Sequence, residues 1–322
     1  MSADSEFLSF IHLPDDIFRE VLQRLPQCDV HMLRRVCKSF CSLVDGHIGR
    51  MTFARPLPNT SVVPYCSRYQ QLLTVEVEDA EYVLGAHAWE LLYQLGQLHD
   101  LRTVIVTNPR YAHTKLVLPA DSVSHLVKGC AQLRTLFLEQ FVLANDDTLR
   151  DIANHCTNLK HLRICGSYGG QKVTDWGVRH IAQCCRKLVS LELSGNVSRV
   201  TNLSLEAIQN NCSRIRSLCL GAMQVNADKI PTLALNLSVS DYAVSNLLQR
   251  MNVQRIVLRP GFRYNDLTDV ALLGVHNVSE VESLDLLNIP VNGDGLNHVL
   301  RSPRLRYAWF GDIRMFDFSI VL

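Results

Sequence analysis

The sequence has almost no excess of charge of either sign. Its 322 residues include 32 Lys and Arg against 31 Asp and Glu, which leaves a net charge of +1. Such a balance gives no whole-molecule field that attracts nucleic acid or an anionic membrane. No run approaches the ~18 apolar residues of a spanning helix, and the start, MSADSEFLSF, lacks the basic and apolar regions of a leader. We expect a soluble protein of the cytoplasm, the nucleus or both, with neither nucleic acid nor membrane as a partner.

Cysteine is too sparse for a fold held by disulfides. There are eleven cysteines, an odd number, and in the absence of a leader they indicate free thiols in a reducing compartment. Neither the neighbours Cys184 and Cys185 nor the pair Cys37 and Cys41 has the doubled Cys-x-x-Cys spacing of a zinc site. We therefore predict no metal and no cofactor.

Motifs of catalysis are absent as well. The glycines within 166–170 fit neither the dinucleotide nor the phosphate-loop spacing, and the histidines lack a pattern such as His-Glu-x-x-His. We predict that the chain is not an enzyme and has no catalytic residue. One alternative stays open, a redox enzyme with a reactive thiol at Cys219, whose strand position faces outward.

The stretch from Leu13 to Val44 has the signals of three short helices. Pro14 is tolerated at a first helical turn, and the two aspartates after it lie at the positive end of the helix dipole. Apolar residues then recur at helical spacing until Pro26, and a second helical pattern after Asp29 continues until Gly46. A unit of fewer than ~40 residues buries little on its own, so we expect it to need a partner.

The order Leu-Pro, acidic, Ile, then Leu-x-x-Leu-Pro, Asp-Val, Leu and Val-Cys-Lys-Ser-Phe over residues 10–46 resembles the F-box. The resemblance implies a module that binds a Skp-type adaptor and, through it, a cullin-RING ubiquitin ligase. Phe40 stands where the family often has Trp, which keeps an aromatic side chain. Carried over by position, the implied adaptor contacts are Leu13, Pro14, Ile17, Leu22, Leu25, Val36, Cys37 and Phe40. The alternative is an ordinary three-helix cap.

A repeat governs the remaining two thirds of the chain. The template Leu-x-x-Leu-x-Leu begins at Leu133, Leu159, Leu188 and Ile215, which lie 26, 29 and 27 residues apart. A cysteine precedes each start by three positions, at the end of an apolar helical pattern. Strand, loop and helix at this period resemble the leucine-rich repeat, and the cysteines resemble its cysteine-containing subtype. We expect these four cysteines, at 130, 156, 185 and 212, to be buried inert thiols.

The predicted fold is α/β: a short N-terminal three-helix F-box followed by a curved leucine-rich-repeat solenoid with a parallel concave sheet. We assign residues 1–9 to a tail, 10–46 to the F-box, 47–70 to an irregular connector and 71–322 to about nine repeats with an apolar C-terminal cap, MFDFSIVL. The repeat spacing is broken over 222–252. Residues 230–235 there resemble a further strand, which comes too early for a full repeat.

Strand alternation predicts a binding surface, because the residues on either side of the central Leu face away from the core. Aromatic residues and Arg at these positions most often anchor interfaces, although they can equally pack along the sheet. The candidates for substrate binding are Phe137, Arg163, Arg255, Tyr307 and Trp309. The sequence thus predicts a substrate-recognition subunit of a Skp/cullin/F-box ubiquitin ligase, which acts by holding a target protein near the ubiquitin-charged enzyme. The alternative is a non-ligase leucine-rich-repeat scaffold.

Overall fold

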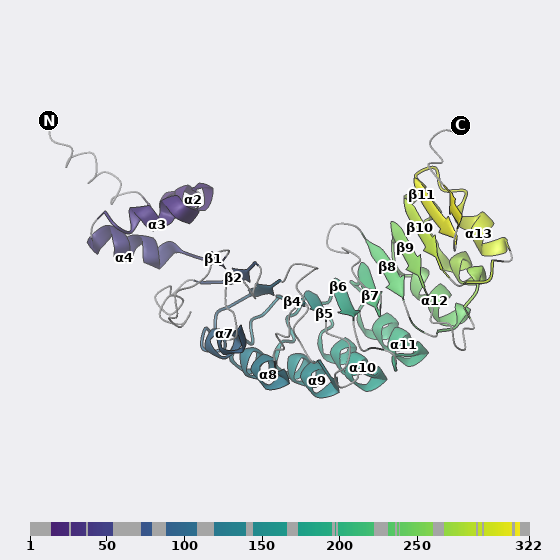
Figure 1. Ribbon diagram of the computed structural model, residues 1–322, viewed down its shortest axis with the longest axis horizontal. Helices are drawn as coiled ribbons and strands as arrows, with labels where there is room; N and C mark the ends of the chain where they lie inside the picture. The colour runs from purple at the N-terminus through teal and green to yellow at the C-terminus, as the bar shows by residue number, and fades with distance from the viewer. Residues whose placement is uncertain are drawn as a thin grey trace.

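The computed structural model describes residues 14–25, 27–36, 38–53, 72–78, 88–107, 119–139, 144–165, 173–194, 197, 199–221, 231–235, 237, 239–259, 267–287, 289–291, 293–310 and 313–315. It forms an arc, with the helices α2, α3 and α4 at its N-terminal end and a long curved sheet that follows them (Figure 1). Among the described residues, no helix is long and apolar enough to cross a membrane.

Among the described residues, the N-terminal unit has three helices, as the sequence predicted: α2 (Asp15–Arg24), α3 (Gln27–Leu33) and α4 (Lys38–His47). Pro14 is the residue before α2, and the backbone carbonyl of Pro14 accepts a hydrogen bond from the N–H of Phe18. Phe18 is buried, and its ring meets that of His47 edge-on at 5.2 Å between centroids. Gly46 does not end the last helix as expected, because α4 continues through it to His47.

In the described part of the chain, twelve strands form a single sheet in sequence order, of which the first eleven are parallel and the last is antiparallel. They are β1 (Arg50–Phe53), β2 (Thr74–Val77), β3 (Thr103–Val106), β4 (Thr135–Glu139), β5 (His161–Cys165), β6 (Ser190–Ser194), β7 (Ser217–Leu220), β8 (Thr232–Leu235), β9 (Arg255–Leu258), β10 (Ser283–Leu286), β11 (Tyr307–Phe310) and β12 (Ile313–Met315). The nine expected strands are present, and the predicted solenoid is confirmed.

Three strands go beyond that expectation. β1 lies within the segment that we predicted to be an irregular connector, and it pairs with β2 from Arg50 opposite Thr74 to Phe53 opposite Val77. β8 is the strand that comes too early for a full repeat, and it is inserted between β7 and β9. β12 returns antiparallel along β11. The rest of the predicted cap, residues 316–322, lies outside the described residues.

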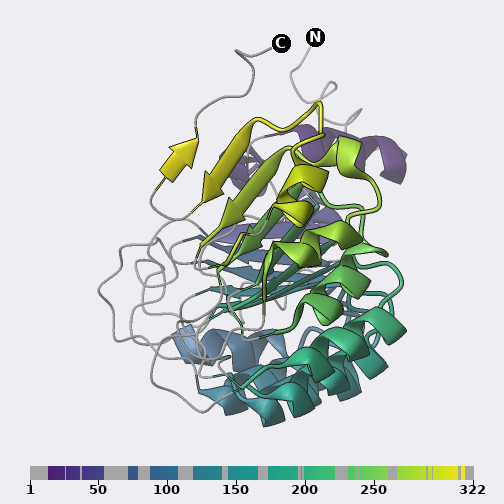
Figure 2. The ribbon, with the colours of Figure 1, turned by 90° about the vertical axis from the view of Figure 1, so that its right-hand side faces the viewer.

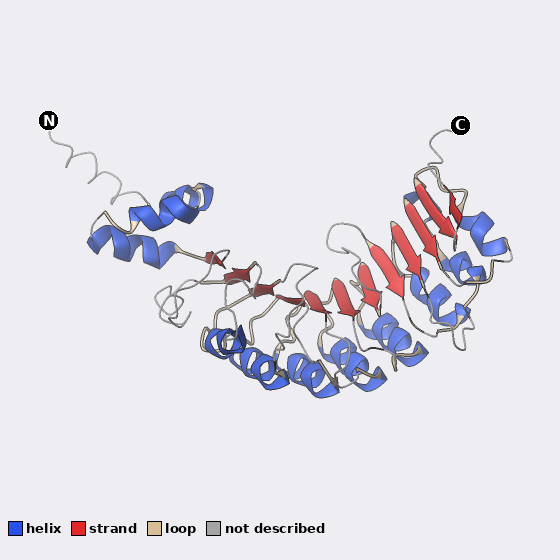
Figure 3. Ribbon diagram, viewed as in Figure 1, coloured by secondary structure: helices blue, strands red, loops and turns tan. Residues whose placement is uncertain are grey.

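Helices line the outer side of the arc and strands its inner side (Figure 3), and an end-on view shows the two layers (Figure 2). The outer elements are α7 (Ala88–Leu95), α8 (Ala120–Gly129), α9 (Asp146–His155), α10 (Asp175–Cys184), α11 (Asn202–Asn211), α12 (Asp241–Leu248), the 3-10 helices η2 (Asp269–Gly274) and η3 (Val278–Glu280), and α13 (Asp294–Val299). The parallel strands need such crossovers because a tight hairpin cannot join them.

Acidic residues at the starts of several helices connect one repeat to the next. Asp146 accepts the N–H of Thr174 at 2.8 Å and its hydroxyl at 2.6 Å, and Asp175 does the same for Thr201 at 2.8 and 2.7 Å. The Thr hydroxyl in turn accepts a backbone N–H of its own helix, as at Trp176. Each of these carboxylates therefore accepts hydrogen bonds from the residue that caps the next helix, and it also lies at the positive end of the dipole of the helix to which it belongs.

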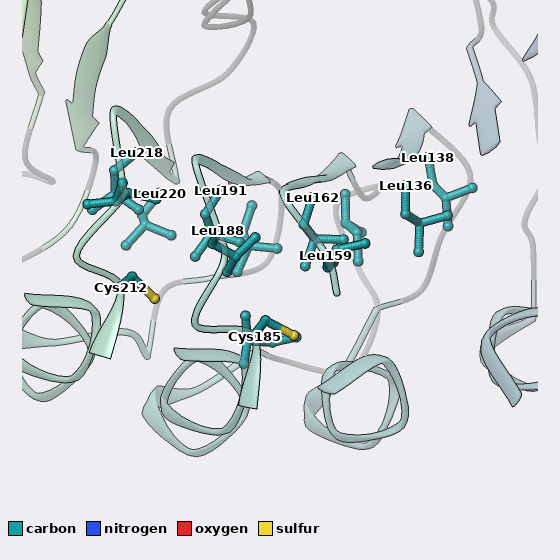
Figure 4. Close-up of a cluster of buried hydrophobic side chains, with 14 of the residues drawn as sticks. Leu136, Leu138, Leu159, Leu162, Cys185, Leu188, Leu191, Cys212, Leu218 and Leu220 are labelled. Carbon is teal, nitrogen blue, oxygen red and sulfur yellow. The ribbon is translucent and has the colours of Figure 1, made fainter. Parts of the chain in front are cut away.

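The core lies between the two layers, where the repeat leucines point from the strands toward the helices (Figure 4). The four repeat cysteines are buried there, as predicted, and Cys185 donates its S–H to the Cys156 carbonyl of the preceding repeat at 3.5 Å. Burial raises the pKa of Cys130 and of Cys156 from 9.0 to about 12. These thiols therefore stay protonated near neutral pH and are unreactive.

Candidate functional site

The N-terminal unit exposes a group of apolar side chains that its own helices do not bury. Ile17 in α2 is 44% exposed, Met32 in α3 is 59% exposed, and Val36 in the turn after α3 is 46% exposed. Large apolar side chains at such exposure are usual singly, but three within twenty residues of one small helical unit leave several apolar side chains open to a partner. Pro14, at the start of α2, is exposed as well.

The neighbours of these residues supply the core of the unit. Phe18, Leu22, Val30 and Val44 are buried, and Leu25 packs partly buried against them. Leu22 therefore belongs to the core rather than to the exposed surface, a correction to its predicted role, because α2 turns the side of Phe18 and Leu22 inward and the side of Ile17 outward.

The remaining predicted adaptor contacts stand as follows. Pro14, Ile17 and Val36 are exposed as an adaptor contact requires. Leu13 and Cys37 lie outside the described residues, as does the side chain of Phe40 in α4. The sequence prediction omitted Met32, although its position two residues after the buried Val30 indicates the opposite face of a helix.

An ion pair fixes the end of this surface. Arg34, in the turn after α3, donates from Nε to Asp45 Oδ1 at 2.5 Å and from Nη2 to Asp45 Oδ2 at 3.2 Å. Both side chains are largely buried, so the pair is well shielded from solvent. Because Asp45 belongs to α4, this two-point contact holds the turn that carries Val36 against α4.

The second predicted surface, the concave face of the sheet, is closed by internal contacts in its centre. Arg163 on β5 lies between two carboxylates: its Nη1 is 2.8 Å from Glu139 Oε1 on β4, and its Nε is 2.8 Å from Glu192 Oε2 on β6. The guanidinium carbon lies 4.7 Å from the centroid of the Phe137 ring. The Arg163 side chain is only 7% exposed. Arg163 and Phe137 thus form an internal cluster, which corrects the expectation that Arg163 is a free anchor.

The strands after this cluster also have a covered concave face. Cys219 on β7, Ala234 on β8 and Val257 on β9 lie side by side in the sheet and form a small buried cluster of their own. Cys219 therefore faces away from the main core, as predicted, but it is fully buried. A redox role at Cys219 lacks the accessible thiol that it requires.

At the C-terminal end of the concave face, the candidate Tyr307 is exposed and the candidates Arg255 and Trp309 are partly exposed. Tyr307 on β11 is 68% exposed, and Arg255 on β9 shares its row in the sheet, with Ser283 between them. Trp309 is partly covered because the Arg259 guanidinium carbon lies 5.5 Å from its ring centroid. The concave candidates that stay accessible are thus at the end of the solenoid far from the N-terminal helices.

Arg259 itself was missed by the sequence reasoning. It follows the last apolar residue of β9, outside the template, and it pairs through two nitrogens with the Asp285 carboxylate on β10. Hydrogen bonding to Asp285 raises the pKa of the guanidinium above its usual value. No signal along the chain could have indicated this pair, since the partners are 26 residues apart.

The described residues contain no group of three or more His, Cys, Asp and Glu that could hold a metal ion. Their conspicuous charged cluster, around Arg163, consists of ion pairs among neighbouring strands.

Comparison with known proteins identifies the N-terminal unit. Residues 10–49 match the F-box domain. Among solved structures, a chain of the Rad7 and Elc1 complex in yeast is similar over 95% of this chain and 80% of its own length, with 13% identity and a TM-score of 0.46. A leucine-rich-repeat protein of Leptospira interrogans is similar over 81% of this chain and 77% of its own, with 12% identity and a TM-score of 0.37.

The chain therefore combines an F-box with a leucine-rich-repeat solenoid. F-box domains bind Skp-type adaptors, and chains with this combination are in general receptor subunits of Skp/cullin/F-box ubiquitin ligases.

Proposed function

We propose that this chain is the substrate-recognition subunit of a Skp/cullin/F-box ubiquitin ligase, located in the cytoplasm, the nucleus or both. The F-box binds the Skp-type adaptor and the solenoid binds a target protein. The chain does no chemistry itself. It holds the target beside a ubiquitin-charged enzyme elsewhere in the assembly, which raises the effective concentration of the target lysine.

The observation that carries the proposal is the exposed apolar surface of Ile17, Met32 and Val36 on a matched F-box. The solenoid supports it, because its concave face presents Tyr307, Trp309 and Arg255 at the end away from the F-box. That separation lets adaptor and target bind at the same time.

A pull-down with a purified Skp-type adaptor tests the adaptor half of the proposal. Replacing Ile17 and Val36 together by Glu places two charges on the apolar surface, so we expect adaptor binding to fall by about a hundredfold, in the range of interface hot spots. The matched control replaces two exposed leucines of the solenoid, Leu203→Glu with Leu273→Glu, and should bind as the wild type does. Undiminished binding by the Ile17 and Val36 variant would refute the assignment.

Reconstitution with a cullin distinguishes the ligase from a scaffold. If the adaptor-bound chain recruits the cullin and supports ubiquitin transfer to a bound protein, the receptor role is established. If the adaptor binds and the cullin does not, the non-ligase scaffold replaces it.

A further inference from the structure

One edge of the solenoid is strongly basic although the whole chain is nearly neutral. It consists of the short segments that lead from each helix to the next strand, from α7 to β9, where the helices end and the strands begin. These segments, 96–102, 130–134, 156–160, 185–189, 212–216 and 249–254, hold one acidic residue, Asp100. With Lys128 at the end of α8, the cations of this basic edge are Arg102, Lys128, Arg134, Lys160, Arg186, Lys187, Arg214, Arg216 and Arg250. All nine are exposed.

Part of the basic edge is a stack of neighbours. The residues just before neighbouring strands are joined by backbone hydrogen bonds. The N–H of Arg134 donates to the carbonyl of Arg102 at 2.7 Å, and the N–H of Lys160 donates to the carbonyl of Arg134 at 2.8 Å. The series continues from Val189 to the Lys160 carbonyl and from Arg216 to the Val189 carbonyl, both at 2.8 Å. Neighbouring strands lie about 4.8 Å apart. Arg102, Arg134 and Lys160 are therefore held one strand apart from each other, with no residue of opposite charge between them.

Stability does not explain this stack. Five of the nine cations, such as Lys128 and Arg250, stand at or just after helix C-termini, where positive charge is favourable. Arg102, Arg134, Lys160 and Arg216 instead precede strands and gain nothing from a helix dipole. None of the nine forms an ion pair among the described residues, and like charges this close repel. A bound polyanion would remove that repulsion.

The kind of anion follows from the rest of the molecule. No Phe, Tyr or Trp stands in the six segments to stack against bases. The opposite edge carries acidic residues, because the first turns of the helices there hold Asp121, Asp146, Asp147, Asp175 and Asp241, of which Asp121 and Asp147 are exposed. A narrow basic row on a solenoid whose opposite edge is acidic suits an extended chain with Asp and Glu side chains better than a nucleic acid, whose phosphates extend beyond the row.

We propose that the basic edge from α8 to α12 binds an acidic, extended segment of a partner protein. This inference rests on the proposed function, in that the solenoid is what binds a target protein. The helices that carry the edge pack about 10 Å apart, so four intervals span about 40 Å, the reach of an extended segment of about 12 residues. The centre of the concave face is covered, whereas this edge is accessible along the middle of the solenoid.

Fluorescence anisotropy with a defined probe tests the proposal. The probe is a labelled peptide of about 12 residues with alternating Glu and Ser, matched to the span of the edge, and its control has Gln in place of Glu. Both are titrated with the full chain in complex with its Skp-type adaptor. We expect the Glu peptide to bind, the Gln peptide not to bind, and added salt to weaken binding because exposed charges are screened.

Two variants of equal net charge locate the binding. Arg134→Glu with Lys160→Glu reverses two cations of the stack, and we expect about tenfold weaker binding or more. Arg179→Glu with Arg199→Glu reverses two exposed cations elsewhere and should leave the affinity unchanged. Melting temperatures check that both variants fold.

Three results would overturn the inference: no binding of the Glu peptide by the wild type, equal weakening by both variants, or about tenfold tighter binding of an oligonucleotide of equal charge. Adaptor binding is measured separately by pull-down. A failure of the adaptor proposal can therefore be distinguished from a failure of the proposal that the basic edge binds an acidic segment.

Discussion

Arg163 shows how a residue chosen for its exposed position in the repeat becomes part of the protein interior. Its side chain and that of Glu192 are 7% and 4% exposed, so both charges are removed from water. Burying an ion pair gains little over apolar residues of the same size, but leaving one partner alone is costly. The cluster of Arg163 with Glu139, Phe137 and Glu192 therefore favours the observed pairing of β4, β5 and β6.

Removing the guanidinium should show this cost. We expect Arg163→Met to lower the free energy of unfolding by about 3–5 kcal/mol, because the Glu192 carboxylate remains buried without its cation. Adding Glu192→Gln to that variant removes the buried charge and should restore part of the loss. Urea unfolding followed by circular dichroism measures both. Equal stability of the single and double variants would show that the buried charge does not cause the loss.

At the scale of elements, close helix packing depends on glycine at particular points. Gly129 ends α8 where it meets the residue after α7, and a Cβ there would lie 1.7 Å from the Gly96 carbonyl oxygen. Gly46 lies inside α4, and a Cβ there would have nothing within 4 Å. The first glycine is required by contact between backbones, and the second is not.

The two glycines should respond in opposite directions to alanine. Gly129→Ala must push two backbone segments apart, so we expect a loss of about 1–3 kcal/mol. Gly46→Ala should gain about 0.5–1 kcal/mol, because alanine loses less conformational entropy in a helix. Thermal unfolding of the two variants and the wild type measures whether each substitution lowers or raises the stability. A neutral Gly129→Ala would mean that α7 and α8 separate easily.

For the whole molecule, one apolar core runs from Phe18 in the F-box to Ala308 in the last parallel strand. Residue 50 begins β1 only three residues after α4 ends, so the F-box leads directly into the sheet. In a solenoid, however, each repeat contacts mainly its neighbours. Loss of the F-box should therefore affect the first strands much more than the distant ones.

A chain that lacks residues 10–46 tests this division. We expect it to keep the circular dichroism of the solenoid, to melt at a lower temperature because the β1 end loses its cover, and to bind no Skp-type adaptor. Proteins captured by both the full and the shortened chain would be partners of the solenoid. Adaptor binding by the shortened chain would place the adaptor surface outside the F-box.

The repeat pattern predicted most of the fold, and its failures have physical causes. The leucines at 133, 159 and 188 recur at the repeat period, and a local pattern suffices to place a strand whose core-facing side chains are apolar. β1 has only four residues, Arg50–Phe53, without the leucine template, and it is a strand because β2 offers it an edge. Leu22 and Ile17 share one apolar pattern, so the sequence could not tell which of them faces the core.

The sequence by itself determined the three short helices, the repeat period, and the burial of the four repeat cysteines, because each follows from spacing along a single helix or strand. Only the tertiary structure decided which outward-facing side chains stay available. Arg163 and Glu192 are 29 residues apart along the chain and become partners when β5 and β6 stack. Stacking also assembled the basic edge, since Arg102, Arg134 and Lys160 become neighbours only when consecutive repeats pair in register. Spacing within one repeat fixes which way a side chain points, and pairing between repeats fixes what it meets there.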